Sequence, residues 1–139
     1  EIIPEVFTTA KEMFKEELLV SGYVSSREEY RSWLARGSVV VSTAIQENFG
    51  ISVVEAVRNG CFPLLPNRLS YPEIMPREFH DEIMYRSTSD LLQKLENFFK
   101  DPDRVFSLRQ SLSDYTRRFS WEITVKQYDK VLEKFKKES

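Results

Sequence analysis

The sequence is poor in cysteine, glycine and proline, with one, four and six of them in 139 residues. Cys61, the single cysteine, cannot form a disulfide within the chain, which favours a reducing, cytoplasmic setting. So few glycines and prolines exclude a low-complexity or flexible protein. The length suits one domain that buries its own core without metal or disulfide support.

Long apolar runs and an excess of charge of one sign are also missing. No run approaches the roughly 18 apolar residues of a spanning helix, and no signal-peptide pattern is present. The net charge is −2, and the one basic cluster, Arg117-Arg118, is too small for a nucleic-acid footprint. The sequence therefore predicts no membrane segment and no nucleic-acid clamp formed by this domain alone. It begins with Glu1 rather than Met, so we expect a piece of a longer protein.

Short apolar runs alternate along the chain with amphipathic stretches. The runs predict buried strands at Leu18–Val20, Val39–Val41, Cys61–Leu65 and Ile83–Tyr85, although Pro63 is unfavourable in a central strand. Helices are expected between these strands, and three more close the chain. This alternation predicts right-handed β-α-β units, hence a Rossmann-like α/β domain with a parallel sheet and helices on both faces. Ligands bind such sheets at the carboxyl ends of the strands.

The stretch from Thr43 to Gly60 begins at that edge. Glu47 falls in a loop, and a helix is expected to start near Ile51 or Ser52, where free backbone N–H groups suit a phosphate or a sugar hydroxyl. Glu55, one turn further on, can reach the same edge and accept hydrogen bonds from both hydroxyls of a ribose. Alternatively, Ser52 and Glu55 form a capping box and Glu47 is a solvated side chain. The local pattern leaves these alternatives open.

The segment Glu47–Ala56 matches the E-x-F-G-[IL]-x-x-x-E-A signature of retaining GT-B glycosyltransferases of the family 4 type. Further marks follow in the family's order: Gly22-Tyr23-Val24, a strand ending in Ser42, Gly60-Cys-Phe-Pro63, Pro72-Glu73 and Phe119-Ser120-Trp121. Over nearly its whole length the chain therefore resembles the C-terminal, nucleotide-sugar-binding half of a GT-B fold. The run from Asn67 to Tyr71, in place of two family glycines, resembles the branch of tRNA-queuosine mannosyltransferases and their glycosyltransferase-like relatives.

The resemblance implies a role for each residue that matches the family's motifs. Glu47 is the implied catalytic residue, in contact with hydroxyls of the donor hexose. The loop Asn48-Phe49-Gly50-Ile51 is implied to bind the donor, with the backbone N–H groups of Phe49, Gly50 and Ile51 on the sugar and diphosphate. Glu55 is implied to hold the ribose diol, and Tyr23 and Val24 to flank the base. Arg68 either supplies positive charge near the diphosphate or is a surface arginine in a loop.

The implied function is transfer of a hexose, mannose from GDP-mannose, to queuosine-modified tRNA, without metal or cofactor. A UDP-hexose donor, a lipid, glycan or small-molecule acceptor, and a non-catalytic nucleotide-sugar-binding module are the alternatives. Nothing before Glu1 corresponds to the family's first strand of this domain or to its N-terminal acceptor domain. Residues 1–139 are therefore expected to be one donor-binding domain that is inactive alone. The C-terminal helix, 118–139, is expected to pack partly on the missing domain and so to leave aromatic side chains exposed.

Several other features suggest chemistry that a simpler interpretation explains better. Asp101-Pro-Asp103 resembles a metal motif, but Asp101 is better explained as a helix N-cap followed by Pro102. His80 has no Cys or His neighbours and is expected in a surface loop. Cys61 is expected to be a small buried apolar residue. The apolar stripe from Trp121 to Phe135 is expected to belong to a core rather than to a cofactor site.

Overall fold

The computed structural model describes residues 4–138, so residues 1–3 and 139 of the predicted ranges 1–139 and 118–139 lie outside it. The chain divides into two compact units, with the boundary after Tyr30. The first unit contains helix α1 (Glu5–Met13) and the start of helix α2 (Arg27–Arg36). At the start of α2, Ser26 Oγ accepts a hydrogen bond from Glu29 N at 3.1 Å, as its spacing in the sequence predicts.

The strand predicted at Leu18–Val20 is wrong. These residues are irregular, and Leu19 is 70% exposed. A buried strand needs a neighbouring strand to take its backbone hydrogen bonds. Among its described residues the first unit has only helical elements, so it offers no such partner.

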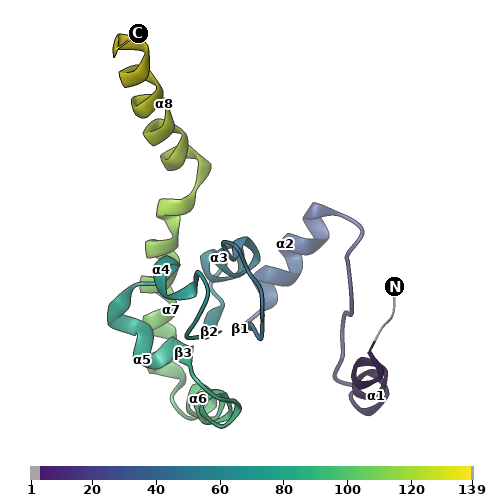
Figure 1. Cartoon of the computed structure of the whole chain (residues 1–139). Helices are drawn as coiled ribbons and strands as arrows, with labels where there is room; N and C mark the ends of the chain where they lie inside the picture. Colours follow the sequence, from purple (N-terminus) through teal and green to yellow (C-terminus); the bar gives the residue numbers. More distant parts are fainter. Residues whose placement is uncertain (1–3, 139) are drawn as a thin grey trace. The chain divides into compact units, whose positions relative to one another are not determined.

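The second unit contains the sheet (Figure 1). Its strands are β1 (Val39–Val41), β2 (Phe62–Pro66) and β3 (Met84–Tyr85). Its α-helices after α2 are α3 (Ile51–Arg58), α4 (Tyr71–Ile74), α5 (His80–Ile83), α6 (Thr88–Lys100), α7 (Pro102–Thr116) and α8 (Trp121–Glu138). Two 3-10 turns, η1 (Arg77–Phe79) and η2 (Arg117–Phe119), complete it.

The three strands of the second unit form one parallel sheet in the order β1-β2-β3, which confirms the predicted α/β fold. Pro63 is tolerated in the central strand because of its position there. Phe62 N donates to Ser38 O and Leu64 O accepts from Ser42 N, so these two residues make the bonds to the β1 side. Pro63 faces the other side, where β3 begins only opposite Leu65. No ladder hydrogen bond is lost at Pro63.

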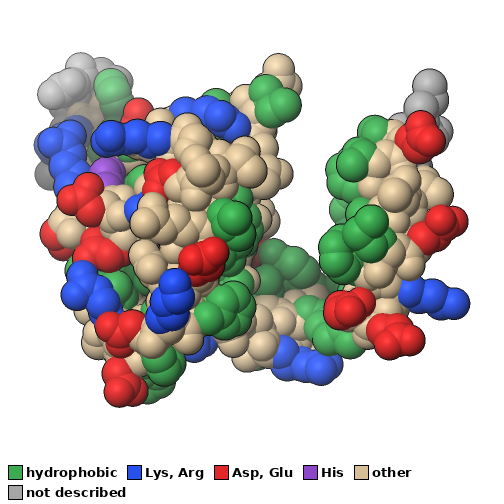
Figure 2. All heavy atoms as spheres, turned by 90° about the horizontal axis from the view of Figure 1, so that it is seen from below, with side chains coloured by type: hydrophobic (Ala, Val, Ile, Leu, Met, Phe, Trp, Pro, Cys, Tyr) green, Lys and Arg blue, Asp and Glu red, His purple; other side chains and the backbone are tan. Residues whose placement is uncertain are grey.

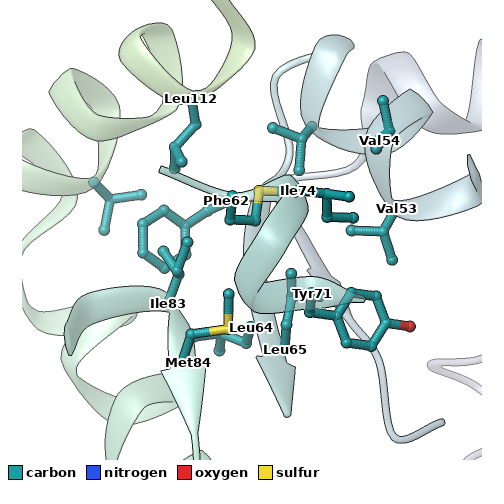
Figure 3. Packing of buried hydrophobic residues seen from close by; sticks show 13 residues of the cluster. Val53, Val54, Phe62, Leu64, Leu65, Tyr71, Ile74, Ile83, Met84 and Leu112 are labelled. Carbon is teal, nitrogen blue, oxygen red and sulfur yellow. The ribbon is translucent and has the colours of Figure 1, made fainter. Parts of the chain in front are cut away.

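The core lies on both faces of β2. All five of its residues are buried, and because successive side chains point to opposite faces, helices must cover both. Helices α3, α5, α6 and α7 pack against it. Figure 3 shows Leu64 and Leu65 of β2 among apolar side chains from the surrounding helices, including Val53, Ile83 and Leu112.

The apolar stripe of α8 does not belong to this core. Trp121, Tyr128 and Phe135 are 70%, 60% and 64% exposed, so the prediction of a core stripe is wrong, whereas the predicted exposure of aromatic side chains is confirmed. Helix α1 is similarly exposed. Hydrophobic side chains gather along one side of it and acidic side chains along the other (Figure 2), and its Phe7 and Met13 are 58% and 68% exposed. Each helix thus presents apolar surface that its own unit does not bury.

Candidate functional site

The loop between β1 and α3 closes around the carboxylate of Glu47. Glu47 Oε1 accepts hydrogen bonds from the backbone N–H groups of Asn48, Phe49 and Gly50, at 3.0, 3.3 and 2.9 Å. Among the described residues, Glu47 Oε2 has no hydrogen-bond partner. One carboxylate oxygen therefore fixes the loop, and the other stays open to a ligand. The alternative of a simple solvated side chain does not describe Glu47.

The N–H groups that the resemblance assigns to the donor are thus partly engaged. Those of Phe49 and Gly50 bind Glu47, whereas the N–H of Ile51 makes no hydrogen bond to the described residues. Ile51 is the first residue of α3, where N–H groups have no partner within the helix. The first free backbone N–H group at this edge is therefore that of Ile51.

The start of α3 decides against the capping box of Ser52 and Glu55. The N-cap is Gly50, in a left-handed conformation (φ 89°, ψ 40°), and no side chain caps the helix. Ser52 is already the second helical residue, so that alternative is wrong. The helix begins earlier than a capping box requires because glycine adopts a left-handed φ without steric cost. Glu55 lies one turn into α3 and is half-buried.

Residues after β1, at the end of β3 and at the start of α4 tie this loop to its neighbours. Ser42, just after β1, shares a 2.7 Å hydrogen bond between its Oγ and the hydroxyl of Tyr71, and its carbonyl accepts one of 2.6 Å from the hydroxyl of Tyr85 in β3. Ser70 Oγ donates to Phe49 O at 3.0 Å. These contacts agree with the predicted place of the loop at the carboxyl edge. The residue pattern predicted no role for Ser42, Tyr71 or Tyr85, although Ser42 directly follows β1 and Tyr85 ends β3.

Arg68 follows β2 and reaches the same loop. Its Nη2 and Nε donate to Ala44 O at 3.0 and 3.4 Å. It is exposed, as the surface-arginine alternative requires, but its guanidinium is held against the edge that carries Glu47. Burial raises the pKa of the Tyr85 hydroxyl, and the Arg68 charge opposes this shift in part. Arg68 therefore adds a cation to this edge.

The remaining predicted donor-binding residues lie in both units. Phe49 packs its ring edge-on against Phe119, with 5.4 Å between ring centroids, while Asn48 and Ile51 are exposed. Tyr23 and Val24 belong to the first unit. There Tyr23 is fully exposed and Val24 is half-buried.

Asp101, His80 and Cys61 have structural roles. Asp101 Oδ1 caps α7 by accepting from Arg104 N at 3.0 Å, as predicted. His80 is not in a loop: it opens α5, half-buried, with Nε2 3.2 Å from Met75 O. Cys61 is buried, as predicted, and burial raises the pKa of its thiol. Within residues 4–138, no group of three or more His, Cys, Asp or Glu side chains is placed to hold a metal ion.

Comparison with known proteins places the chain in a family. The model of the family described as "Glycosyl transferases group 1" matches residues 7–119. The chain is also 38% identical over 120 residues to the tRNA-queuosine alpha-mannosyltransferase of Drosophila melanogaster, an alignment that covers 86% of this chain and 30% of that protein. The chain thus spans less than a third of the length of this curated relative. None of the helices described is long and apolar enough to cross a membrane.

Proposed function

Because this chain belongs to the group 1 family of glycosyl transferases, we propose that it forms the donor-binding half of a retaining hexosyltransferase. The observation that carries the proposal is that the two oxygens of the Glu47 carboxylate differ: Oε1 binds the loop, and Oε2 has no hydrogen-bond partner among the described residues. Oε1 holds three backbone N–H groups, so the position of Oε2 is fixed before a ligand arrives. A carboxylate oxygen whose position is fixed in advance suits hydrogen bonds from the hydroxyls of a hexose, because little ordering is required on binding.

The diphosphate of the donor is assigned to the first turn of α3. The N–H of Ile51 is available there, and the helix dipole favours negative charge at this end. Arg68, held on Ala44 O, adds positive charge at the same edge. Glu55, one turn further along, binds the ribose diol. In this arrangement the protein orients the donor and stabilises its leaving diphosphate, and it supplies no covalent nucleophile and no metal.

The acceptor is assigned from the relative, which is named for transfer of mannose to tRNA-queuosine. We propose GDP-mannose as donor and queuosine-modified tRNA as acceptor for the full-length protein, acting in the cytoplasm. The alternatives are a UDP-hexose donor, a lipid, glycan or small-molecule acceptor, and a module without catalysis that binds donor but transfers nothing.

We also propose that α8 packs on a further domain of the full-length protein. Its exposed Trp121, Tyr128 and Phe135 form an apolar surface that a neighbouring domain would cover. That domain would supply the acceptor site.

The test is a transfer assay of the full-length protein with GDP- and UDP-sugars, including queuosine-modified tRNA among the acceptors. Glu47→Gln and Glu47→Ala should lower the transfer rate by about 10- to 100-fold, the worth of one charge-assisted hydrogen bond of roughly 1.5–3 kcal/mol. Gln46→Ala, at the exposed neighbouring position, should stay within about twofold of wild type. Unchanged transfer by both Glu47 variants would contradict the catalytic assignment, and donor binding without transfer to any acceptor would identify a binding module.

A further inference from the structure

A hollow of about 320 Å³ lies beside the end of α3 that is remote from the Glu47 loop. It is lined by three arginines that are separated in the sequence: Arg58 at the end of α3, Arg109 in α7 and Arg117 in η2. Phe106, Gln110 and Ser113 also line it. The fold thus gathers three guanidinium groups where the sequence shows only the pair Arg117-Arg118.

A backbone carbonyl and two nearby carboxylates hold these arginines only in part. Arg109 Nε donates to Gly60 O, and Arg117 Nε lies 3.3 Å from Asp114 Oδ1. The guanidinium of Arg58 makes no hydrogen bond to the described residues, and Glu122 is the carboxylate that interacts with its charge. Each arginine therefore keeps N–H donors that can bind a ligand.

The hollow carries an excess of positive charge. None of the described residues that line it is acidic, and Asp114 and Glu122 beside it supply two negative charges against three arginines. Guanidinium groups match the oxygens of phosphate, which accept paired hydrogen bonds. Phe106 adds an aromatic ring, 74% exposed, to the same hollow. Cations next to an exposed ring are what an unpaired nucleotide requires, because its phosphate takes the charge and its base stacks on the ring.

We propose that this hollow binds a backbone phosphate of the RNA acceptor, with an unpaired base of that RNA stacked on Phe106. The proposal rests on the proposed RNA acceptor, and it adds a contact away from the donor site. RNA held at the far end of α3 gains affinity without obstructing the Glu47 loop.

The test is the affinity of the full-length protein for fluorescein-labelled tRNA that carries queuosine, measured by anisotropy over a range of salt concentrations. Arg58→Gln/Arg117→Gln should weaken binding on the order of 10-fold. It should also reduce the slope of log K against log salt by about 0.7–0.9, the contribution of one neutralised phosphate. The control, Arg31→Gln/Arg77→Gln, removes the same charge from exposed positions elsewhere. Phe106→Ala should weaken binding and leave the slope unchanged.

If Arg58→Gln/Arg117→Gln and the control variant weaken tRNA binding equally, the proposal is overturned, because the loss of affinity would then reflect only the change in net charge. Unchanged tRNA binding by the arginine variant would overturn it as well, even if inorganic pyrophosphate bound there, since the hollow would then be a small-anion site. Phe106→Ala that binds like wild type would overturn the stacking. Wild-type protein that binds no tRNA would overturn both this inference and the proposed RNA acceptor. The donor affinity of each variant, measured in parallel, reports separately on the donor site.

Discussion

Gly50 lies directly against the ring of Tyr71. A Cβ at Gly50 would come 3.1 Å from Tyr71 Cε1 and 3.2 Å from the side chain of Ile74, and the φ of Gly50 is +89°. The turn that carries Glu47 thus requires glycine for two independent reasons, its left-handed backbone and the close approach of buried α4 side chains.

The matched substitutions Gly50→Ala and Gly60→Ala separate these reasons. Gly60 has a similar φ of +92°, but its nearest neighbour is Arg109 Nη2 at 3.5 Å, an ordinary contact. Gly60→Ala should therefore cost only the left-handed strain, about 1–2 kcal/mol. Gly50→Ala adds crowding in the core, typically 1–3 kcal/mol, and should lower the free energy of unfolding by about 2–5 kcal/mol. Urea denaturation measures both, and equal losses would show that Tyr71 does not confine Gly50.

Glu55→Gln and Ser52→Ala test the two roles once open for this helix start. Because the N-cap is Gly50, Ser52→Ala should change the free energy of unfolding by no more than about 0.5 kcal/mol. Glu55→Gln removes charge from the proposed ribose contact and should weaken donor binding in the full-length protein about 10- to 100-fold. Calorimetric titration with GDP-mannose and a thermal melt are needed for each variant. Wild-type affinity in Glu55→Gln would end the ribose assignment, and a marked loss of stability in Ser52→Ala would restore a capping role.

Leu69→Gly should stabilise the protein. Leu69, in the Asn67–Tyr71 run that stands in place of the family's glycines, has a φ of +62°, the one positive value among the described non-glycine residues. Left-handed strain of about 1–2 kcal/mol exceeds the 0.5–1 kcal/mol that glycine costs through chain entropy. We expect a gain of about 0.5–1 kcal/mol by urea denaturation. Leu92→Gly, at an exposed position of helix α6, is the control and should lose about 1 kcal/mol. A loss at Leu69 similar to that at Leu92 would show that the loop is unstrained.

Tyr85→Phe should destabilise the protein by about 0.5–1.5 kcal/mol at neutral pH, because the hydrogen bond to Ser42 O is lost. The pKa of the Tyr85 hydroxyl is raised in the folded protein, chiefly by burial. The unfolded chain therefore loses this proton first as the pH rises. The contribution of Tyr85 is complete below the ordinary pKa of 10.0 and is lost as the pH rises through the higher folded value. The difference between wild type and Tyr85→Phe in urea denaturation should thus be constant up to about pH 9 and shrink above pH 10. A difference that grows in this range would contradict a raised pKa.

Local sequence patterns were enough to predict the three parallel strands, the edge at which Glu47 lies and the N-cap at Asp101. Each rests on a local pattern that one element carries: apolar runs of strand length, a loop directly after a strand, or a cap before proline. The run Leu18–Val20 has the same pattern and is not a strand, because strand formation also needs a partner and cover, neither of which is written in the run itself.

The contacts of the site residues depend instead on tertiary packing. Glu47 binds the N–H groups of its own loop because the left-handed Gly50, held against Tyr71, turns the backbone toward the carboxylate. Arg58, Arg109 and Arg117 come together because α3 and α7 pack side by side, although up to 59 positions separate them. Contacts between distant residues depend on how helices pack on the sheet, and that packing depends on the whole core rather than on any segment of the sequence.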